Sequence, residues 1–511
     1  MFKKLLVANR GEIALRVMRT CREIGVGTVA VYSDVDRAAL HVRYADEAYL
    51  LGPGTPGESY LNIERIIDVA KSSGADALHP GYGFLAENAS LVDACEQAGI
   101  TFVGPSARTM RLVGDKVAAR RLAGDAGVPV VPGAESIDGH DEAVAVAQRL
   151  GFPVLVKAVA GGGGKGIRIV RSLSEMEAAL SVAGSEAAAA FGDHNLYIEK
   201  FLDRVRHVEV QFIGDTHGNV ISLGERECSL QRRHQKLIEE SPSPAVGAAL
   251  REELCAAAKK VAEAAGYRNA GTAEFLLDES GRFYFLEINA RLQVEHPVTE
   301  LVTGTDLVAD QLRVAAGEPL GYGQEDVRLS GSALECRIAA EDPFNDFLPS
   351  FGRIDYVSHP AGPGIRVDSA LYAGADLPYY YDPMIAKVIA WGRDRDEAIR
   401  RLHRALSEFV VVGVETNIPF HLQLLEDPRF LAGEMHTRFL EEEFSPAAPA
   451  ADEDGRVALI AAALLVHRAK TEPPVAPPFT DGHAWRTAGR LATLRGGKPA
   501  TRGRGWQRDT G

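Results

Sequence analysis

Residues 287–296 of this 511-residue chain, with the sequence EINARLQVEH, constrain its fold more than any other stretch. Every second residue from Glu287 to Glu295 is polar or charged and the residues between are apolar, which is the period of an extended strand. Residues 272–278 and 282–288 have strand-like compositions on either side of a Ser-Gly turn, which is typical of a β-hairpin. The pattern therefore predicts a hairpin whose second arm continues to Glu295 with its polar side chains on one face.

This hairpin would bring two glutamates together. With the turn at Ser280 and Gly281, Glu274 faces Glu287, and Asn289 follows on the same face. Two carboxylates directly opposite each other repel, whereas a hard cation between them, with the Asn289 amide as a third oxygen ligand, removes that penalty. A solvated polar edge is the alternative, but the neighbours suit a buried sheet. We therefore predict a divalent-metal site at Glu274, Glu287 and Asn289.

A glycine-rich loop between two short apolar segments predicts a phosphate site. Residues 161–166 read GGGGKG and join residues 152–158 to residues 167–170. The order GxxxxGK[ST] is absent, which excludes a Walker P-loop, but glycine N–H groups can still approach phosphate oxygens closely. A flexible hairpin tip is the alternative, and it leaves Lys157 unexplained because an unpaired ammonium in an apolar strand is costly. We predict an anion bound by Lys157, Gly162, Gly163, Gly164, Lys165 and Gly166.

Three weaker signals lie elsewhere in the chain. Residues 195–202 could present backbone groups to a nucleotide base and Glu199 to ribose hydroxyls. Residues 226–236 are rich in potential cations and could offset phosphate charge, with a solvated basic loop as the alternative. Tyr82, between two glycines, could offer its ring to a ligand or simply pack in a turn. The residues of the basic segment assigned to the site are Gln231, His234 and Lys236.

The order of the predicted elements divides the chain into four parts. Residues 1–114 read as an open α/β layer, and residues 115–330 carry the glycine loop and the hairpin. Residues 331–444 read as a smaller β-rich domain. Residues 445–511 read as a helix, a Pro-rich linker and a basic low-complexity tail.

Composition narrows the possible functions. The net charge of -14 argues against a nucleic-acid partner. The five cysteines have no CxxC spacing, so they fit a reducing compartment and neither a zinc site nor a disulfide framework. The longest apolar run, residues 457–466, is half of the roughly 20 residues that a membrane helix needs. We therefore expect a cytoplasmic protein with no membrane segment.

Together these groups describe an enzyme that acts on a nucleoside triphosphate. Phosphoryl transfer needs positioning and charge neutralisation, which a glycine flap, a lysine and a metal site supply. Arg291 has a fork geometry suited to a planar oxyanion. Glu295 is placed as a general base.

The chain resembles biotin carboxylase, the ATP-grasp component of biotin-dependent carboxylases of the acetyl-CoA and propionyl-CoA carboxylase alpha type. The resemblance is carried by LLVANRGEIA at residues 5–14, HPGYGFL at residues 79–85, the glycine loop, RHVE at residues 206–209 and residues 287–300, and it extends to Phe444. It implies α/β and α+β classes combined: an ATP-grasp fold, an N-terminal Rossmann-like domain, a C-terminal β-rich domain and a mobile lid at about residues 131–203.

The resemblance also implies an activity. Biotin on a carrier protein would be carboxylated with ATP and bicarbonate, via carboxyphosphate, as the first half-reaction of an acyl-CoA carboxylase in fatty acid metabolism. The implied cofactors are ATP, two Mg²⁺ or Mn²⁺ ions, and biotin supplied in trans. The implied partners are a biotin carboxyl carrier protein and a carboxyltransferase subunit, and a homodimer is expected. The sequence does not encode which acyl-CoA is carboxylated.

Individual roles follow from the same resemblance. Glu274, Glu287 and Asn289 match metal positions, and Glu295 matches the base that deprotonates bicarbonate. Arg337 matches the residue that stabilises the biotin enolate, and Tyr82 matches a biotin contact. The bicarbonate pocket matches Lys236, Arg291, Gln293 and Val294. The ATP-contacting positions match Lys116, Lys157, Glu199, Lys200, Leu202 and His207, with the glycine loop as the lid.

One departure from the long carboxylase subunits concerns the biotinyl domain. The chain has no Ala-Met-Lys-Met motif, so it is either a free-standing subunit or a truncated longer one, and the carrier must come in trans.

Two other functional classes remain possible. Another ATP-grasp ligase would share the metal and ATP residues, and a non-catalytic nucleotide-binding subunit would be expected to lack Glu295 or Arg337, which are both present.

Overall fold

The computed structural model describes residues 1–134, 137, 139–158, 167–191, 196–448, 462–464 and 467. The chain divides into two compact units, Met1–Pro446 and Ala447–Gly511. Of the helix predicted within the second unit, residues 462–464 and 467 are described and are helical. The predicted Pro-rich linker and basic tail lie outside the described residues. Within the described ranges, no helix has the length and apolar character needed to cross a membrane.

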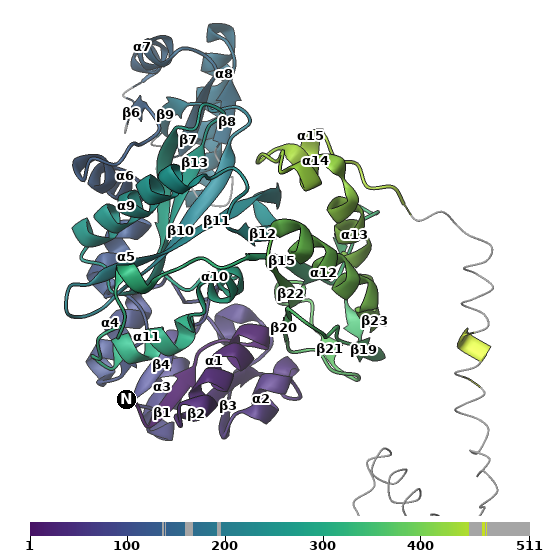
Figure 1. Ribbon diagram of the computed structural model, residues 1–511. Helices are drawn as coiled ribbons and strands as arrows, with labels where there is room; N and C mark the ends of the chain where they lie inside the picture. Colours follow the sequence, from purple (N-terminus) through teal and green to yellow (C-terminus); the bar gives the residue numbers. More distant parts are fainter. Residues whose placement is uncertain are drawn as a thin grey trace, which may run out of the picture. The chain divides into compact units, whose positions relative to one another are not determined.

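The N-terminal part is a five-stranded parallel sheet in the order β3-β2-β1-β4-β5, which confirms the predicted open α/β layer (Figure 1). Leu5, Leu6 and Val7 of β1 are fully buried, as in a parallel sheet with helices on both faces. The strands are β1 Lys4–Val7, β2 Gly27–Ser33, β3 Glu47–Gly52, β4 Ala77–His79 and β5 Thr101–Phe102. The helices are α1 Gly11–Glu23, α2 Leu40–Tyr44, α3 Ile63–Ser73, α4 Ala89–Ala98 and α5 Ala107–Gly114.

A separate four-stranded sheet, in the order β6-β9-β7-β8, follows in the chain. Helices α7 and α8 pack against it through a small apolar core (Figure 1). The glycine loop lies between β7 and β8 but outside the described residues, so its predicted phosphate contacts remain predictions. The elements are α6 Lys116–Asp125, β6 Gly133–Ala134, α7 His140–Leu150, β7 Val154–Ala158, β8 Ile167–Val170, α8 Met176–Phe191 and β9 Leu196–Lys200.

The largest sheet has eight strands in the order β14-β13-β10-β11-β12-β15-β22-β20. Its antiparallel pairing of β12 with β15 continues the sheet across residue 330, where the sequence predicted a domain boundary. The strands are β10 Arg206–Gly214, β11 Val220–Arg232, β12 Gln235–Ser241, β13 Asn269–Leu277, β14 Phe283–Asn289, β15 Ser332–Ala339, β20 Ile365–Ser369 and β22 Met384–Gly392. The intervening helices are α9 Ala248–Ala264, α10 His296–Thr303 and α11 Leu307–Ala315.

The C-terminal part of the first unit is rich in short strands, as predicted, and its helices cover the far end of the large sheet. Helix α12 packs against β22 and β15 through a buried apolar cluster that includes Leu402 and Leu406. The helices are α12 Arg395–Glu408, α13 Ile418–Glu426, α14 Pro428–Ala432 and α15 Phe439–Glu442. The short strands are β16 Glu341–Asp342, β17 Leu348–Pro349, β18 Gly352–Arg353, β19 Tyr356–Ser358, β21 Asp376–Leu377 and β23 Val410–Val412.

The predicted hairpin is formed by β13 and β14, and Glu274 does pair with Glu287. A bulge after Glu274 shifts the register by one residue and places Phe275 opposite Phe285. The prediction that the second arm continues to Glu295 is wrong, because β14 ends at Asn289. Residues 290–295 instead turn into α10, which has a proline at its first turn, a position where proline's fixed φ favours helix initiation.

The close packing of the large sheet can be tested at Gly271 in β13. A Cβ atom there would lie 2.6 Å from Cζ of both Phe212 and Tyr267, whose rings pack edge to face. We expect Gly271→Ala to lower the free energy of unfolding by about 1–3 kcal/mol, as overpacking does, in denaturant titrations. Gly124→Ala in α6 is the control, since no atom lies within 4 Å of its Cβ. Equal unfolding midpoints for the two variants would contradict this packing.

Candidate functional site

A cavity of about 620 Å³ is lined by residues from strands β10 to β15 of the large sheet and collects most of the predicted site residues. Two segments of the N-terminal part, residues 9–13 and 82–84, also line it. The predicted residues that line it are Tyr82, His207, Gln231, His234, Lys236, Glu274, Glu287, Asn289, Arg291, Gln293, Val294 and Arg337. In the sequence these residues belong to four separate segments, residues 79–85, 206–209, 226–236 and 272–296, with Arg337 outside all of them.

A second cavity of about 260 Å³ beside the smaller sheet is lined by Lys116, Arg120 and Tyr197 among others, and Lys116 is the predicted nucleotide contact that lines it. Lys116 Nζ is 3.4 Å from Glu287, so this lysine connects the two cavities. Lys200 Nζ donates to the carbonyl of Gly151 at 2.8 Å, and Leu202 follows β9 and is half-buried.

Lys157 has a partner that the sequence did not reveal. It forms an ion pair with Glu199 on the neighbouring strand β9, and Arg120 also donates to Glu199 at 3.0 Å. The premise that Lys157 is an unpaired ammonium is therefore wrong, because Glu199 is its partner, whereas the predicted anion contact stays a prediction. Glu199 is 3% exposed and holds two cations, which also limits its freedom to accept from a ribose.

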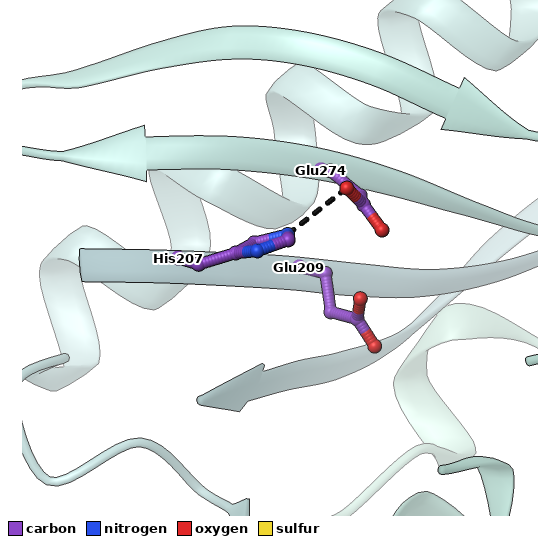
Figure 2. Close-up of side chains that lie close together, drawn as sticks. All are labelled: His207, Glu209 and Glu274. Atoms are coloured by element: carbon purple, nitrogen blue, oxygen red, sulfur yellow. Dashed lines mark ion pairs between the residues drawn. The ribbon is translucent and has the colours of Figure 1, made fainter. Parts of the chain in front are cut away.

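Glu274 is the most heavily bonded carboxylate of the hairpin. Its oxygens lie 3.0 Å from His207 Nε2, 3.2 Å from Lys236 Nζ and 2.8 Å from Asn289 Nδ2. Figure 2 shows His207 on one strand directed toward Glu274 on the next, with Glu209 beside them. Burial alone would raise the pKa of Glu274, but the charges of Lys236 and His207 outweigh it and lower that pKa.

Glu287 has the opposite electrostatic setting. Burial and the facing charge of Glu274 raise its pKa, and Lys116 only partly compensates. A divalent cation between the two carboxylates would remove this repulsion, so the pair fits the predicted metal. Asn289 fits less directly, because its Oδ1 accepts from Arg291 at 3.2 Å. His207, Glu209 and Glu274 also have ligand atoms within 4.8 Å of one another, but the effect of burial on His207 is outweighed by the charge of Glu274, which raises the pKa of His207, and a protonated imidazole cannot bind a metal ion.

Lys236 and Arg337 hold Glu295 between them. Lys236 Nζ donates to Glu295 at 2.7 Å, and Arg337 Nη2 donates to its other oxygen at 2.8 Å. Burial would raise the pKa of Glu295, but Lys236, Arg337 and Arg226 together lower it well below its ordinary value. Glu295 is therefore ionised at neutral pH, fully buried, and covered by two cations that face the cavity.

Arg291 lines the same cavity. Its Nε donates to Glu87 at 3.0 Å and its Nη1 donates to Gln293 at 2.8 Å. Glu87 also accepts from the backbone N–H of Ala290 at 2.9 Å, which anchors the turn between β14 and α10. Arg291 and Lys236 therefore present fixed positive charges to one cavity, an arrangement that can bind an oxyanion.

Several residues of the site were not found from the sequence. Glu209 accepts from Lys236 at 2.6 Å and from Arg226 at 2.5 Å, and Arg226 is fully buried beneath them. Tyr82 is hydrogen-bonded to Glu12. Lys387, a single lysine in the apolar strand β22, donates to the carbonyl of Val294 at 2.7 Å. A single lysine in an otherwise apolar strand is visible in the sequence and could have indicated that Lys387 belongs to the site.

Comparisons with known proteins agree along the chain. Residues 1–110 match the model "Biotin carboxylase, N-terminal domain" and residues 335–442 match "Biotin carboxylase C-terminal domain". Residues 115–322 match "Carbamoyl-phosphate synthase L chain, ATP binding domain". Biotin carboxylase 1 of Bacillus subtilis is 56% identical over 86% of this chain and 98% of its own length. The biotin carboxylase of Nostoc sp. is 52% identical over 86% of this chain and 99% of its own length.

Solved structures are similar over the same region. Campylobacter jejuni biotin carboxylase, solved as a β-γ-ATP complex, has a TM-score of 0.84 at 46% identity and covers 87% of this chain and 99% of its own. The biotin carboxylase domain dimer of Hydrogenobacter thermophilus 2-oxoglutarate carboxylase, solved with MgADP and bicarbonate, has a TM-score of 0.82 at 49% identity and covers 86% and 98%. With the ATP-grasp fold, the paired hairpin carboxylates and the buried Lys236–Glu295–Arg337 group in place, this chain belongs to the biotin carboxylase family.

Proposed function

We propose that this enzyme carboxylates biotin with ATP and bicarbonate, as the first half-reaction of a biotin-dependent acyl-CoA carboxylase. The observation that carries the proposal is the ionised Glu295 held by Lys236 and Arg337 against a cavity bordered by the carboxylate hairpin. A carboxylate, several fixed cations and a metal-binding hairpin around one cavity suit the joining of two oxyanions, ATP and bicarbonate.

The carboxylates of Glu274 and Glu287, with Asn289 beside them, would hold Mg²⁺ or Mn²⁺. When bound, such ions neutralise the charge that develops on phosphate oxygens. Lys116 would bind a phosphate at the boundary between the cavities, since its present partner Glu287 would then turn to the metal. His207 and Gln231, hydrogen-bonded to each other, would position the nucleotide beside Glu274.

Bicarbonate would bind between Lys236 and Arg291, with Gln293 and the backbone of Val294 completing its pocket. Both cations line the cavity and both are held by carboxylates, Glu209 and Glu87, so their positions are set before the substrate enters. Glu295 would accept the bicarbonate proton. Its low pKa keeps it ionised at neutral pH, so it enters the reaction as a carboxylate that has room for a proton.

Arg337 would bind the ureido oxygen of biotin and stabilise negative charge there, and Tyr82 would contact the same group. Arg337 is held by Glu239 and Glu295, and both Arg337 and Tyr82 line the cavity. Because Arg337 and Lys236 share Glu295, the bicarbonate and biotin positions are neighbours. A carboxyl group released at one position would therefore meet the acceptor at the other without leaving the cavity.

The acceptor would arrive on a biotin carboxyl carrier protein and continue to a carboxyltransferase subunit, which would choose the acyl-CoA. We infer a homodimer, since the Hydrogenobacter thermophilus relative was solved as one. A cytoplasmic location is supported by five cysteines that are all free thiols.

Bicarbonate-dependent ATP cleavage, measured with and without free biotin, tests the function. Cleavage that needs an amine or ammonia instead would point to a different ATP-grasp ligase.

The metal assignment predicts a specific response of Glu287→Gln. Without metal, this variant should melt at or above the parent's temperature, because one of two facing carboxylates has lost its charge. Adding Mg²⁺ should raise the melting temperature of the parent but not of Glu287→Gln, which should also lose ATP cleavage. Glu252→Gln, at an exposed position on α9, is the control and should respond like the parent. An unchanged Mg²⁺ response in Glu287→Gln would remove the hairpin from the metal site.

Glu295 and Arg337 should differ in the step that they affect. Glu295→Gln should suppress ATP cleavage and biotin carboxylation together, because the base acts before phosphoryl transfer. Arg337→Ala should reduce carboxylation more than ATP cleavage, so less carboxybiotin forms for each ADP released. Measuring both products in one reaction gives this ratio.

The thermal stability of the two variants distinguishes these catalytic roles from simple loss of the ion pair between Glu295 and Arg337. Breaking an isolated buried pair costs about 3–5 kcal/mol, but each partner here keeps another, Lys236 for Glu295 and Glu239 for Arg337, so smaller losses are expected. Melting curves of both variants, with exposed Arg328→Ala as a control, check this. An equal loss of both reactions in folded Arg337→Ala would assign Arg337 to nucleotide or bicarbonate binding instead.

A further inference from the structure

Glu335 in β15 is a buried acid that the proposed reaction does not use. Its side chain is 0% exposed, and neither carboxylate oxygen has a hydrogen-bond partner among the described residues. Buried polar groups in proteins are almost always hydrogen-bonded, and an ionised carboxylate without a partner is especially costly. A neutral carboxyl, which gains an O–H donor, would satisfy this position if an acceptor lay within reach.

Such an acceptor lies on the adjacent strand. Glu335 of β15 is directly opposite Glu239 of β12, and side chains so paired have Cβ atoms about 4.5–5.5 Å apart. Glu239 Oε1 accepts from Arg337 Nε at 2.6 Å, whereas its Oε2 has no partner in the described part of the chain. The two acids therefore face each other, with one unfilled oxygen on Glu239 and two on Glu335.

Both cations near Glu335 are held by other groups. The charged and titratable groups that face it are Glu239, Glu295, Arg337, Lys387 and Tyr82. Arg337 lies between the carboxylates of Glu239 and Glu295. Lys387 is 3.3 Å from Glu12 and donates to the carbonyl of Val294. Burial therefore raises the pKa of Glu335 well above its ordinary value, and the attraction of Lys387 does not offset it.

We propose that Glu335 is a positioning residue for the carboxylation step: as a neutral carboxyl it donates its O–H to Glu239 and so fixes the carboxylate that orients Arg337. The proton stays on Glu335 throughout, and no covalent bond to it changes. Burial raises the pKa of Glu239 to about 7, and an O–H donated by Glu335 favours its ionised form, with the charge on the oxygen that holds Arg337. The inference rests on the proposed role of Arg337 and extends it to Glu335, two residues away on the same strand.

The variants Glu335→Gln and Glu335→Leu distinguish the effect of hydrogen-bond donation to Glu239 from the effect of charge at residue 335. The glutamine amide can donate to Glu239 and is neutral, so Glu335→Gln should form carboxybiotin per ADP at the parent's ratio. Leucine cannot donate, so Glu335→Leu should lower that ratio by about tenfold or more, since a misplacement of one ångström can cost about 100-fold. ATP cleavage itself should change much less, because Lys236 and its partners remain in place.

Asp310→Leu is a matched control, because Asp310 is another buried acid with a raised pKa, to about 6, mainly from burial, and its partners are Tyr322 and Arg313. It should leave the ratio unchanged. A ratio in Glu335→Gln as low as in Glu335→Leu would mean that the charge of Glu335 matters, and an unchanged ratio in Glu335→Leu would mean that Glu335 positions nothing. Either result overturns the proposal.

Infrared spectroscopy gives a second readout that needs only the glutamine variant, should the leucine variant not fold. At neutral pH the parent spectrum should contain a protonated-carboxyl C=O band that disappears in Glu335→Gln. If the band is absent from the parent or unchanged in the variant, Glu335 is not a neutral acid and the proposal fails. The parent's own biotin carboxylation tests the overall function, so failure of that function and failure of the Glu335 role are distinguishable.

Discussion

The ammonium group of Lys236 is the contact on which the arrangement of the site depends. It lies within 3.2 Å of carboxylates from three different segments: Glu209 in β10, Glu274 in β13 and Glu295 before α10. Each of these carboxylates has a further cation, namely Arg226, His207 or Arg337. Because every member keeps at least one other partner, removing one would weaken the group without leaving an isolated buried charge, and several contacts together hold the three segments in place. The network therefore fixes the relative positions of these three segments as well as the charges in the site.

Local parts of this site could be predicted from sequence because their determinants are close together. The pairing of Glu274 with Glu287 follows from a short turn and alternating polarity. The parallel N-terminal layer likewise follows from short apolar strands separated by amphipathic helices. The alternation failed beyond Asn289, since polar residues every second position also occur in this turn, where the consecutive residues Gln293 and Val294 both line the cavity. Pro297 was the competing signal.

Contacts between distant segments could not be predicted. Lys157 indicated a missing negative charge, but nothing in the sequence distinguishes a phosphate from Glu199, which β9 places beside it. Arg337 and Glu239 meet only because β15 pairs with β12. Such partners depend on strand order, and strand order is decided by the packing of the whole sheet. The family resemblance supplied roles for Arg337 and Glu295, but not the residues that hold them.

The pairing of β12 with β15 has a consequence for biosynthesis. Until Ser332–Ala339 leave the ribosome, β12 would be an edge strand, with unpaired N–H and C=O groups open to pairing with other chains. Completing the sheet further requires β22, which ends at Gly392 and separates β15 from β20. The nascent chain must therefore stay protected long after its nucleotide-binding residues have been made, as chains that fold through incomplete sheets are prone to aggregate. Translation pauses or chaperones that act in this interval would affect the yield of enzyme more than its rate of catalysis.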